Sequence, residues 1–188
     1  EHDEKGTYIF SSKDLCLIKE LPEIVEMGID SLKIEGRLKT EYYLASVVSA
    51  YRNAIDDYMS DPQNYDYTKY LKELEKTKTR GLTTFYFNDR NNKDFQEYEG
   101  KQYNLEYEFG GKVVEEIEDK TIIEIRNRLQ VRDELEIIIP NRLEPVTFTI
   151  DKLWDIDTLD EIDVINPGRQ GQKVLIKLPV KCDSDWII

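Results

Sequence analysis

Residues 15–58 read LCLIKELPEIVEMGIDSLKIEGRLKTEYYLASVVSAYRNAIDDY, and this stretch decides the fold class of the first part of the chain. Apolar residues recur at helical spacing over 15–27, a short strand pattern follows over 31–34, and a second helical stripe runs from Thr40 to Tyr58. Strands that alternate with helices are typical of α/β units with parallel strands. We therefore predict an α/β unit over residues 1–60.

The spacing of apolar residues changes at two places in the remainder of the chain, near residues 61 and 100. Residues 61–99 begin with a turn cluster and carry apolar residues for one short helix that ends near Thr77, so we interpret them as a connector between domains. From residue 100 the apolar period is two, which predicts a small antiparallel β-barrel or sandwich over 100–188. Its expected strands are 105–109, 113–117, 121–125, 134–139, 146–150 and 174–178.

The 188 residues include 26 Lys or Arg and 39 Asp or Glu, giving a formal charge of −13. This acid excess argues against broad capture of DNA, whose phosphates attract dense basic patches, although it permits a local RNA contact. No apolar run approaches the ~20 residues that cross a bilayer, and no signal peptide is evident. We therefore expect no membrane contact and a cytoplasmic protein.

Cysteine and histidine are scarce, with two cysteines near opposite ends of the chain and His2 as the single histidine. These counts argue against a disulfide framework, a Cys/His metal cluster and a His-based triad within this chain. The chain begins at Glu1 without a Met and leads directly into a strand-like Tyr8–Phe10. We take this beginning as a hint that the chain is a fragment.

A candidate ligand site lies where the predicted strand 31–34 ends. Glu35, Arg37 and Lys39 follow it, and the carboxyl ends of parallel strands are where α/β proteins bind ligands. The alternative is a surface salt bridge worth ~0–1 kcal/mol. Tyr42, at the start of the next helix, is open to stacking, whereas Tyr51 and Tyr58 lie on the apolar stripe and favour core packing.

Cys16 is predicted to begin the first helix, where the helix dipole favours a thiolate or a metal ligand. On the residues alone, a small buried hydrophobe is the stronger interpretation.

The second half carries four arginines around the predicted hairpin 125–139. A β-barrel with several arginines on one hairpin can hold RNA, but a solvated hairpin balanced by Glu134 and Glu136 is at least as good an interpretation. These arginines are Arg126, Arg128, Arg132 and Arg142.

Residues 1–55, which contain SKDLC and SLKIEGR, resemble the last part of the catalytic barrel of the collagenase-like peptidase family U32. RNRLQVRDELEIIIP (126–140) and PGRQGQKVLIKLPV (167–180) resemble its C-terminal β-barrel domain. The resemblance therefore implies an α+β chain in two parts, a remnant of a TIM-like barrel followed by a small antiparallel β-barrel. It also implies that the N-terminal part of the barrel, with its paired cysteines, is missing.

The resemblance implies that the intact protein takes part in forming 5-hydroxyuridine in tRNA, with prephenate and an iron–sulfur cluster. Cys16 would then be one of four cluster ligands, the cluster being incomplete in this chain. Glu35 and Arg37 would bind substrate, together with Lys39 and Tyr42. Two alternatives stay open, a collagenase-like peptidase and a non-catalytic companion or RNA- or protein-binding module. We expect the isolated chain to be inactive, and its catalytic residues are unassigned.

Overall fold

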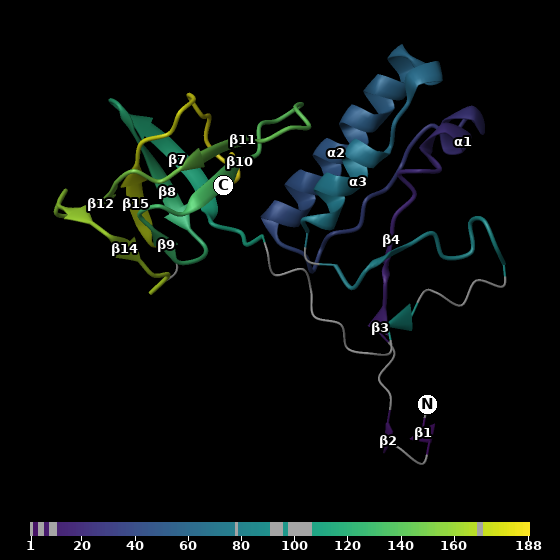
Figure 1. The fold of residues 1–188 in the computed structure, drawn as a ribbon, viewed down its shortest axis with the longest axis horizontal. Coiled ribbons are helices and arrows are strands. Elements are labelled where there is room, and N and C mark those ends of the chain that lie inside the picture. Colours follow the sequence, from purple (N-terminus) through teal and green to yellow (C-terminus); the bar gives the residue numbers. More distant parts are fainter. Residues whose placement is uncertain are drawn as a thin grey trace. The chain divides into compact units, whose positions relative to one another are not determined.

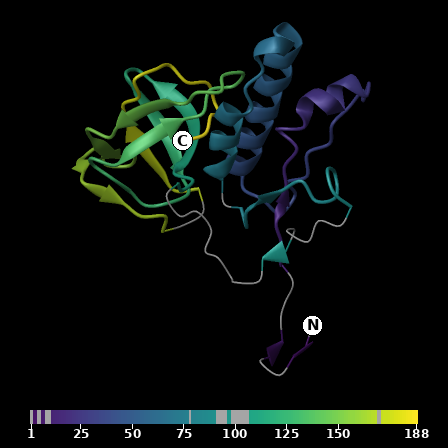
Figure 2. The same ribbon diagram turned by 45° about the vertical axis from the view of Figure 1, so that its right-hand side comes forward.

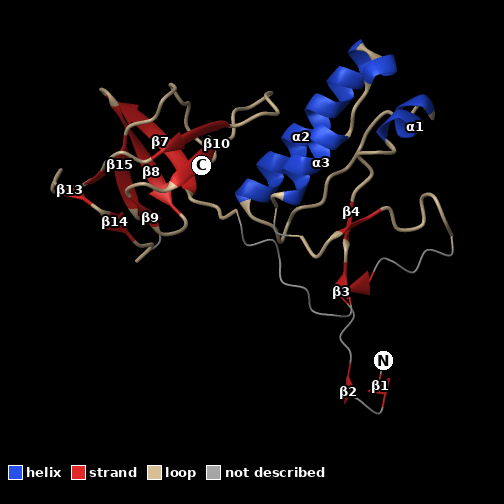
Figure 3. Ribbon diagram, in the orientation of Figure 1, coloured by secondary structure: helices blue, strands red, loops and turns tan. Residues whose placement is uncertain are grey.

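The computed structural model of the protein describes residues 2–3, 6–7, 11–77, 79–90, 96–97, 107–168 and 171–188. The chain divides into two compact units, Glu1–Arg37 with Ser46–Tyr107 and Leu38–Ala45 with Glu108–Ile188. The colours of Figure 1 show that the helices and the larger sheet come from different stretches of the chain, and Figure 3 marks the helices in blue and the strands in red. The strand pattern at Tyr8–Phe10 and the first two residues of the strand predicted over 105–109 lie outside the described residues.

Three α-helices follow one another along the chain, namely α1 (Leu21–Glu26), α2 (Glu41–Ser60) and α3 (Thr68–Glu75), with a 3-10 turn, η1 (Pro62–Asn64), before the last. The long helix predicted from Thr40 and the short helix ending near Thr77 are confirmed. The helix predicted over 15–27 is wrong in its first six residues, because Leu15 belongs to a strand and α1 begins only at Leu21. Gly28, with φ of 73°, ends α1 in a left-handed conformation that suits glycine.

Strands β4 (Asp14–Leu15) and β5 (Leu82–Thr83) form the only parallel pair among the described residues. The backbone N–H groups of Asp14 and Cys16 donate to the carbonyls of Gly81 and Thr83, each at 2.9 Å. Four further short strands pair antiparallel as β1 with β2 and β3 with β6. Their bounds are His2–Asp3, Gly6–Thr7, Ser11–Ser12 and Gln96–Glu97.

The strand predicted over 31–34 is absent from the structure. Residues 29–36 carry no helix or strand, and Leu32 keeps 39 % of its surface exposed. A strand needs a neighbour for its backbone hydrogen bonds, and none of the described strands pairs with this segment. An apolar alternation alone was therefore insufficient to form a strand here.

Helices α2 and α3 lie side by side (Figures 1 and 2) and are joined by tyrosine side chains. The ring of Tyr65 packs edge-on against Tyr58 at 5.5 Å and stacks on Tyr70 at 5.9 Å between centroids. The hydroxyl of fully buried Tyr70 donates to the Asp57 carboxylate, which also accepts from Lys69 Nζ at 2.6 Å. Tyr58 is buried, as expected for a core residue.

Asp57 gives this helix pair a dependence on pH. Hydrogen bonds from Lys69 and Tyr70 hold the pKa of the Asp57 carboxyl below its ordinary value of 3.8. Because the folded-state pKa is the lower one, the carboxylate stabilises the fold above the unfolded pKa, and this contribution disappears as the pH falls through the folded pKa.

Asp57→Asn should therefore lower the melting temperature at neutral pH, by no more than roughly 2–4 °C because solvent screens this half-exposed pair. The difference from wild type should shrink as the pH falls below the ordinary carboxyl pKa of 3.8, and it should disappear below the lowered folded-state pKa. Thermal melting followed by circular dichroism measures both effects. Asp56→Asn is the control, since Asp56 pairs with the exposed Arg52 one turn away on the same helix. A difference that persists in acid would contradict this account.

The second unit is built on an antiparallel sheet of five strands in the order β13-β12-β15-β8-β7 (Figure 1). Two further antiparallel pairs, β10 with β11 and β14 with β9, complete the described strands of this unit. The bounds are β7 (Gly111–Ile117), β8 (Lys120–Ile125), β9 (Leu129–Gln130), β10 (Glu134–Ile137), β11 (Val146–Thr149), β12 (Leu153–Asp155), β13 (Glu161–Ile162), β14 (Val164–Ile165) and β15 (Lys173–Ile176).

Five of the six predicted strands are present in the second unit, within three residues of their expected ends. A closed barrel is wrong, because β13 and β7, the first and last strands of the described sheet, do not pair with each other. The C-terminal residues cover β7 instead, with Val113 N donating to the carbonyl of Trp186 at 2.8 Å. The described part of the strand predicted over 105–109 is irregular. Gly111 permits the close pairing of β7 with β8, since a Cβ at this position would lie 2.6 Å from the carbonyl oxygen of Glu124.

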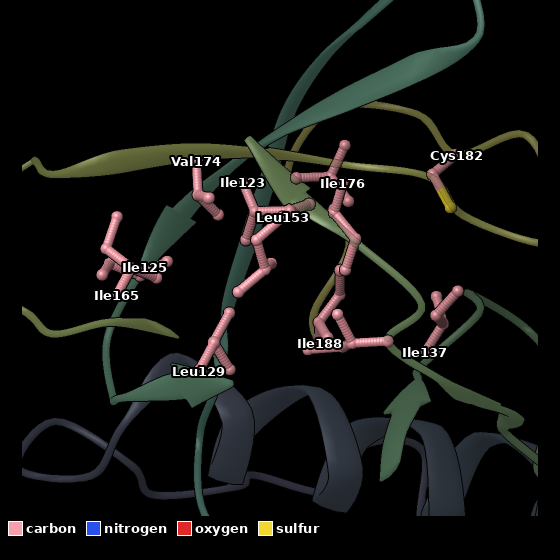
Figure 4. Close-up of a cluster of buried hydrophobic side chains, with 12 residues drawn as sticks. Ile123, Ile125, Leu129, Ile137, Leu153, Ile165, Val174, Ile176, Cys182 and Ile188 are labelled. Atoms are coloured by element: carbon pink, nitrogen blue, oxygen red, sulfur yellow. The ribbon is translucent and has the colours of Figure 1, made fainter. Parts of the chain in front are cut away.

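The core of this unit consists mainly of aliphatic side chains that come from several strands and gather in one cluster (Figure 4). Ile123, Leu153 and Ile176 are each at most 1 % exposed. Their burial follows from the strand alternation, which places every second side chain on one face.

Ile123→Ala should destabilise the second unit by about 2–4 kcal/mol, because the truncation leaves a cavity that packed neighbours fill only in part. Urea unfolding followed by tryptophan fluorescence measures this, since Trp154 and Trp186 both belong to that unit. The matched control is Ile117→Ala on the neighbouring strand, where the side chain is 46 % exposed. Equal losses in the two variants would contradict the assigned core.

Candidate functional site

The parallel pair β4–β5 brings two loop segments to one edge, because each strand leads into a loop at its carboxyl end. Cys16 and Glu20 follow β4, and Asn88 follows β5. After β5 the chain turns sharply, with the N–H of Phe87 donating to the carbonyl of Thr84 at 3.1 Å. Carboxyl edges of parallel strands are where α/β proteins collect their functional side chains. We call Cys16, Glu20 and Asn88 the carboxyl-edge group.

Cys16 is buried and faces helix α2 rather than beginning a helix. The hydroxyl of Tyr51 accepts the N–H of Leu17 at 2.9 Å and donates to Cys16 Sγ at 3.8 Å. Burial raises the pKa of the Cys16 thiol, the opposite of the effect expected at a helix N-terminus. The prediction that Cys16 begins a helix is wrong, because α1 begins five residues later at Leu21.

Glu20 is the carboxylate of the group, and sequence reasoning missed it. Its side chain is 8 % exposed, and its Oε1 accepts a hydrogen bond from Asn88 Nδ2 at 2.9 Å. Asn88 lies 68 residues further along the chain, so no local pattern pairs the two. Glu20 follows β4 and Asn88 follows β5, so the two could have been paired from the sequence only if the parallel pairing of these strands had been known.

An iron–sulfur cluster bound by four thiolates does not fit the residues present. The chain has two cysteines, Cys16 and Cys182, and they belong to different units. Burial also raises the pKa of Cys182, to about 11, which disfavours its thiolate. No group of three or more His, Cys, Asp or Glu side chains that suits a metal ion occurs among the described residues. Cys16 offers one sulfur at most.

The residues predicted to bind substrate lie on an exposed segment. The Glu35 carboxylate accepts the backbone N–H of Arg37 at 2.9 Å, so the contact between these residues is a local turn and not a pairing of their charged groups. Lys39 Nζ lies 4.7 Å from the centroid of the Tyr43 ring. The Tyr42 ring stacks on Phe109 with centroids 6.4 Å apart. The binding role of Glu35, Arg37, Lys39 and Tyr42 stays a prediction.

The four arginines of the second unit are exposed and spread along its loops. Arg126 pairs with Glu124 at 2.5 Å, and Arg128 donates to Gln130. Arg132 and Arg142 lie at opposite ends of the hairpin β10–β11, since one precedes β10 and the other lies in the loop that follows it. The strand topology therefore separates Arg132 from Arg142, and an RNA-binding role for the four arginines stays a prediction.

Comparison with models of protein families identifies the family to which both parts of the chain belong. The model of peptidase family U32 matches residues 1–97, and that of the peptidase family U32 C-terminal domain matches residues 105–188. The chain therefore belongs to peptidase family U32, as its SKDLC and KIEGR motifs indicated.

Individual relatives carry two kinds of name. The chain is 39 % identical to tRNA hydroxylation protein P1 of Bacillus subtilis (strain 168) over 82 % of its own length and 37 % of that protein. It is 36 % identical to tRNA hydroxylation protein P of Escherichia coli (strain K12), covering 99 % of this chain and 40 % of that protein. It is also 24 % identical to a collagenase of Porphyromonas gingivalis, over 96 % of this chain and 49 % of that protein.

The chain thus spans less than half the length of these curated relatives. Among solved structures, it is similar to the C-terminal domain of a Geobacillus thermoleovorans protein named as a U32 peptidase. That likeness has a TM-score of 0.38 and 26 % identity, over 43 % of this chain and 96 % of that one.

The burial of Cys16 predicts that its thiol reacts slowly in the folded protein. In a Cys182→Ser background, Cys16 should react with a thiol reagent such as DTNB at least about tenfold more slowly than in guanidinium, because burial shields the thiol and disfavours the thiolate. Tyr51→Phe should destabilise the fold by about 1–2 kcal/mol, since it leaves the N–H of Leu17 without an acceptor. Absorbance of the released thiolate gives the rates. Native labelling as fast as in guanidinium would contradict the burial of Cys16.

Proposed function

We propose that the complete protein takes part in hydroxylation of uridine in tRNA. The observation that carries this proposal is the match of 82 % and 99 % of the chain to two tRNA hydroxylation proteins, at 39 % and 36 % identity. The two matches span both units and are not limited to one shared domain. The substrate we propose is the wobble uridine, converted to 5-hydroxyuridine.

Within that reaction, this chain would supply part of the active site and a positioning domain. The carboxyl-edge group places a buried thiol, a buried carboxylate and an exposed amide at the end of a parallel strand pair, where α/β proteins hold substrates. The second unit, which matches the family's C-terminal domain, would position RNA. Its net charge of −7 over residues 100–188 restricts any RNA contact to local sites such as the four arginines.

Two further components of the proposal belong to the complete protein. Prephenate would be its small-molecule substrate, and an iron–sulfur cluster would supply redox chemistry, with three ligands outside this chain and Cys16 as the fourth. We do not expect the isolated chain to bind a cluster or to catalyse the reaction. We also propose that the protein works in the cytoplasm with its tRNA. No helix in the described part of the chain is long and apolar enough to cross a membrane.

The second candidate is a collagenase-like peptidase, which the family name and the collagenase relative favour. A cysteine peptidase needs a thiol activated by a base. Within the described residues, Cys16 contacts the Tyr51 hydroxyl, and burial raises the pKa of the thiol. This environment is that of an unreactive thiol, so Cys16 is a poor candidate for the nucleophile of a peptidase.

Deletion of the complete gene should abolish 5-hydroxyuridine in tRNA nucleosides measured by liquid chromatography and mass spectrometry. A plasmid copy of the gene should restore it. A copy that lacks residues 108–188 should restore little, because the family's C-terminal domain is then absent. Unchanged 5-hydroxyuridine in the deletion strain, in a host without a second copy of the gene, would refute the proposal. Gelatin cleavage by the purified complete protein would favour the peptidase.

A further inference from the structure

The five-stranded sheet of the second unit has one face toward the hydrophobic core and one face away from it. Leu153 on β12 and Ile176 on β15 belong to the core. Successive side chains of a strand point to opposite faces, so their neighbours Trp154 and Leu175 lie on the other face. We call this second face the outer face of the sheet.

Three lysines of the outer face lie in one row across the neighbouring strands β12, β15 and β8 (Figure 1). The registers of β12 with β15 and of β15 with β8, continued by one residue, place Lys152 opposite Lys177 and Lys177 opposite Lys120. Neighbouring strands are about 5 Å apart, so the row is about 10 Å long. We call Lys120, Lys152 and Lys177 the lysine row. The sequence did not indicate it, because the three lysines lie far apart along the chain.

The position of Lys120 agrees with this placement. Its Nζ lies 4.6 Å from the centroid of the Trp154 ring, although Lys120 belongs to β8 and Trp154 to β12. The Lys120 side chain therefore extends over β15, which lies between these two strands, along the outer face. The contact with the ring holds its ammonium group within the row.

A row of like charges is unfavourable in a sheet, because charges on directly opposite residues repel each other. Lys177 Nζ pairs with Asp119 at 2.6 Å, and Lys152 Nζ pairs with Glu161 at 2.5 Å. The lysine side chains of these pairs are 61 % and 54 % exposed, and such exposed ion pairs contribute little stability. Two acids against three lysines leave the row positive.

The other acids of the outer face do not neutralise the lysine row. Glu115 lies opposite Ile122, one row further along the sheet. Glu124 lies opposite Lys173, and its carboxylate pairs with Arg126 at 2.5 Å. The lysine row is therefore a local positive site on a unit that is acidic as a whole.

The partner that suits this row is a chain of phosphates. Lysine ammonium groups bind phosphate as point charges, and exposed ammonium groups in a line can contact successive phosphates of one strand. We propose that the lysine row binds the phosphate backbone of the substrate tRNA without reading its sequence. The choice of tRNA rests on the proposed function. A protein with an acidic surface is the rival partner, and the experiments below separate the two.

Lys177→Gln in the complete protein tests the proposal, and Lys181→Gln is the matched control. Lys181 is an exposed lysine four residues further along the chain, beyond the end of β15. Fluorescence anisotropy measures the affinity for labelled, unmodified tRNA between about 50 and 200 mM salt. Lys177→Gln should lower the slope of log affinity against log salt by about 1, because one phosphate contact is lost. Lys181→Gln should leave the slope unchanged.

Neutralising the whole row should have a larger effect. The triple variant with Lys120, Lys152 and Lys177 changed to Gln should lower the salt slope by about 2–3 and bind tRNA at least about tenfold more weakly at the lowest salt. Its affinity for poly(U) should fall by a similar factor, because phosphate contacts carry no sequence information. The melting temperature without RNA should not fall, since the substitutions remove repulsion between opposite lysines.

Asp119→Asn and Glu161→Gln test the proposal in the opposite direction. Each substitution releases one lysine of the row from its ion pair and removes a negative charge beside the bound phosphates. Each should therefore tighten tRNA binding by roughly twofold to fivefold at low salt. A purely structural role of the lysines predicts no such gain.

Three results would overturn the inference while the proposed function stands. The first is a triple variant with the affinity and salt slope of wild type. The second is an equal loss for Lys177→Gln and Lys181→Gln, which would reflect net charge and not the row. The third is a triple variant that binds tRNA normally but fails to restore 5-hydroxyuridine in the deletion strain, which would favour a protein partner. Unchanged 5-hydroxyuridine in the deletion strain itself refutes the proposed function, and the anisotropy measurements are independent of that result.

Discussion

The first unit depends on the hydrogen bonds that join β4 to β5. Two backbone N–H groups, those of Asp14 and Cys16, donate to carbonyls near residue 82, almost seventy positions away along the chain. All three helices lie between these strands in sequence, so one short pairing closes a long stretch of chain. Ordering so long a loop costs entropy, which the packing of buried side chains such as Leu21, Tyr70 and Leu74 must offset.

The same strand pairing explains why a thiol, a carboxylate and an amide side chain lie at one edge of the first unit. Since the strands are parallel, the loops after both emerge at the same edge, and Cys16, Glu20 and Asn88 come together there. Tyr51, from the long helix, then fixes the Cys16 sulfur by bridging it to the N–H of Leu17. A thiol, a carboxylate and an amide with different environments therefore share one edge, and the carboxylate alone lacks a partner for one of its oxygens among the described residues.

Periodicity predicted much of the regular structure correctly. The stripe of α2 and the alternation of β7, β8, β10, β11 and β15 depend on local sequence, because burial of one face requires that spacing. The first six residues of the helix predicted over 15–27 and the strand predicted over 31–34 were wrong for a shared reason. Whether a short apolar run becomes a strand depends on a neighbouring strand, and that neighbour is distant in sequence or absent among the described strands.

The sequence by itself determined the family, the two-part organisation of its patterns, and the acid excess that restricts nucleic-acid contacts. Its motifs also directed attention to Cys16, Glu35 and Arg37. Only the tertiary structure decided that Cys16 is a buried thiol beside Tyr51, that Arg132 and Arg142 lie at opposite ends of one hairpin, and that Glu20 meets Asn88. The physical reason is that burial and hydrogen-bond partners are properties of space, set by strand pairings that bring distant residues together.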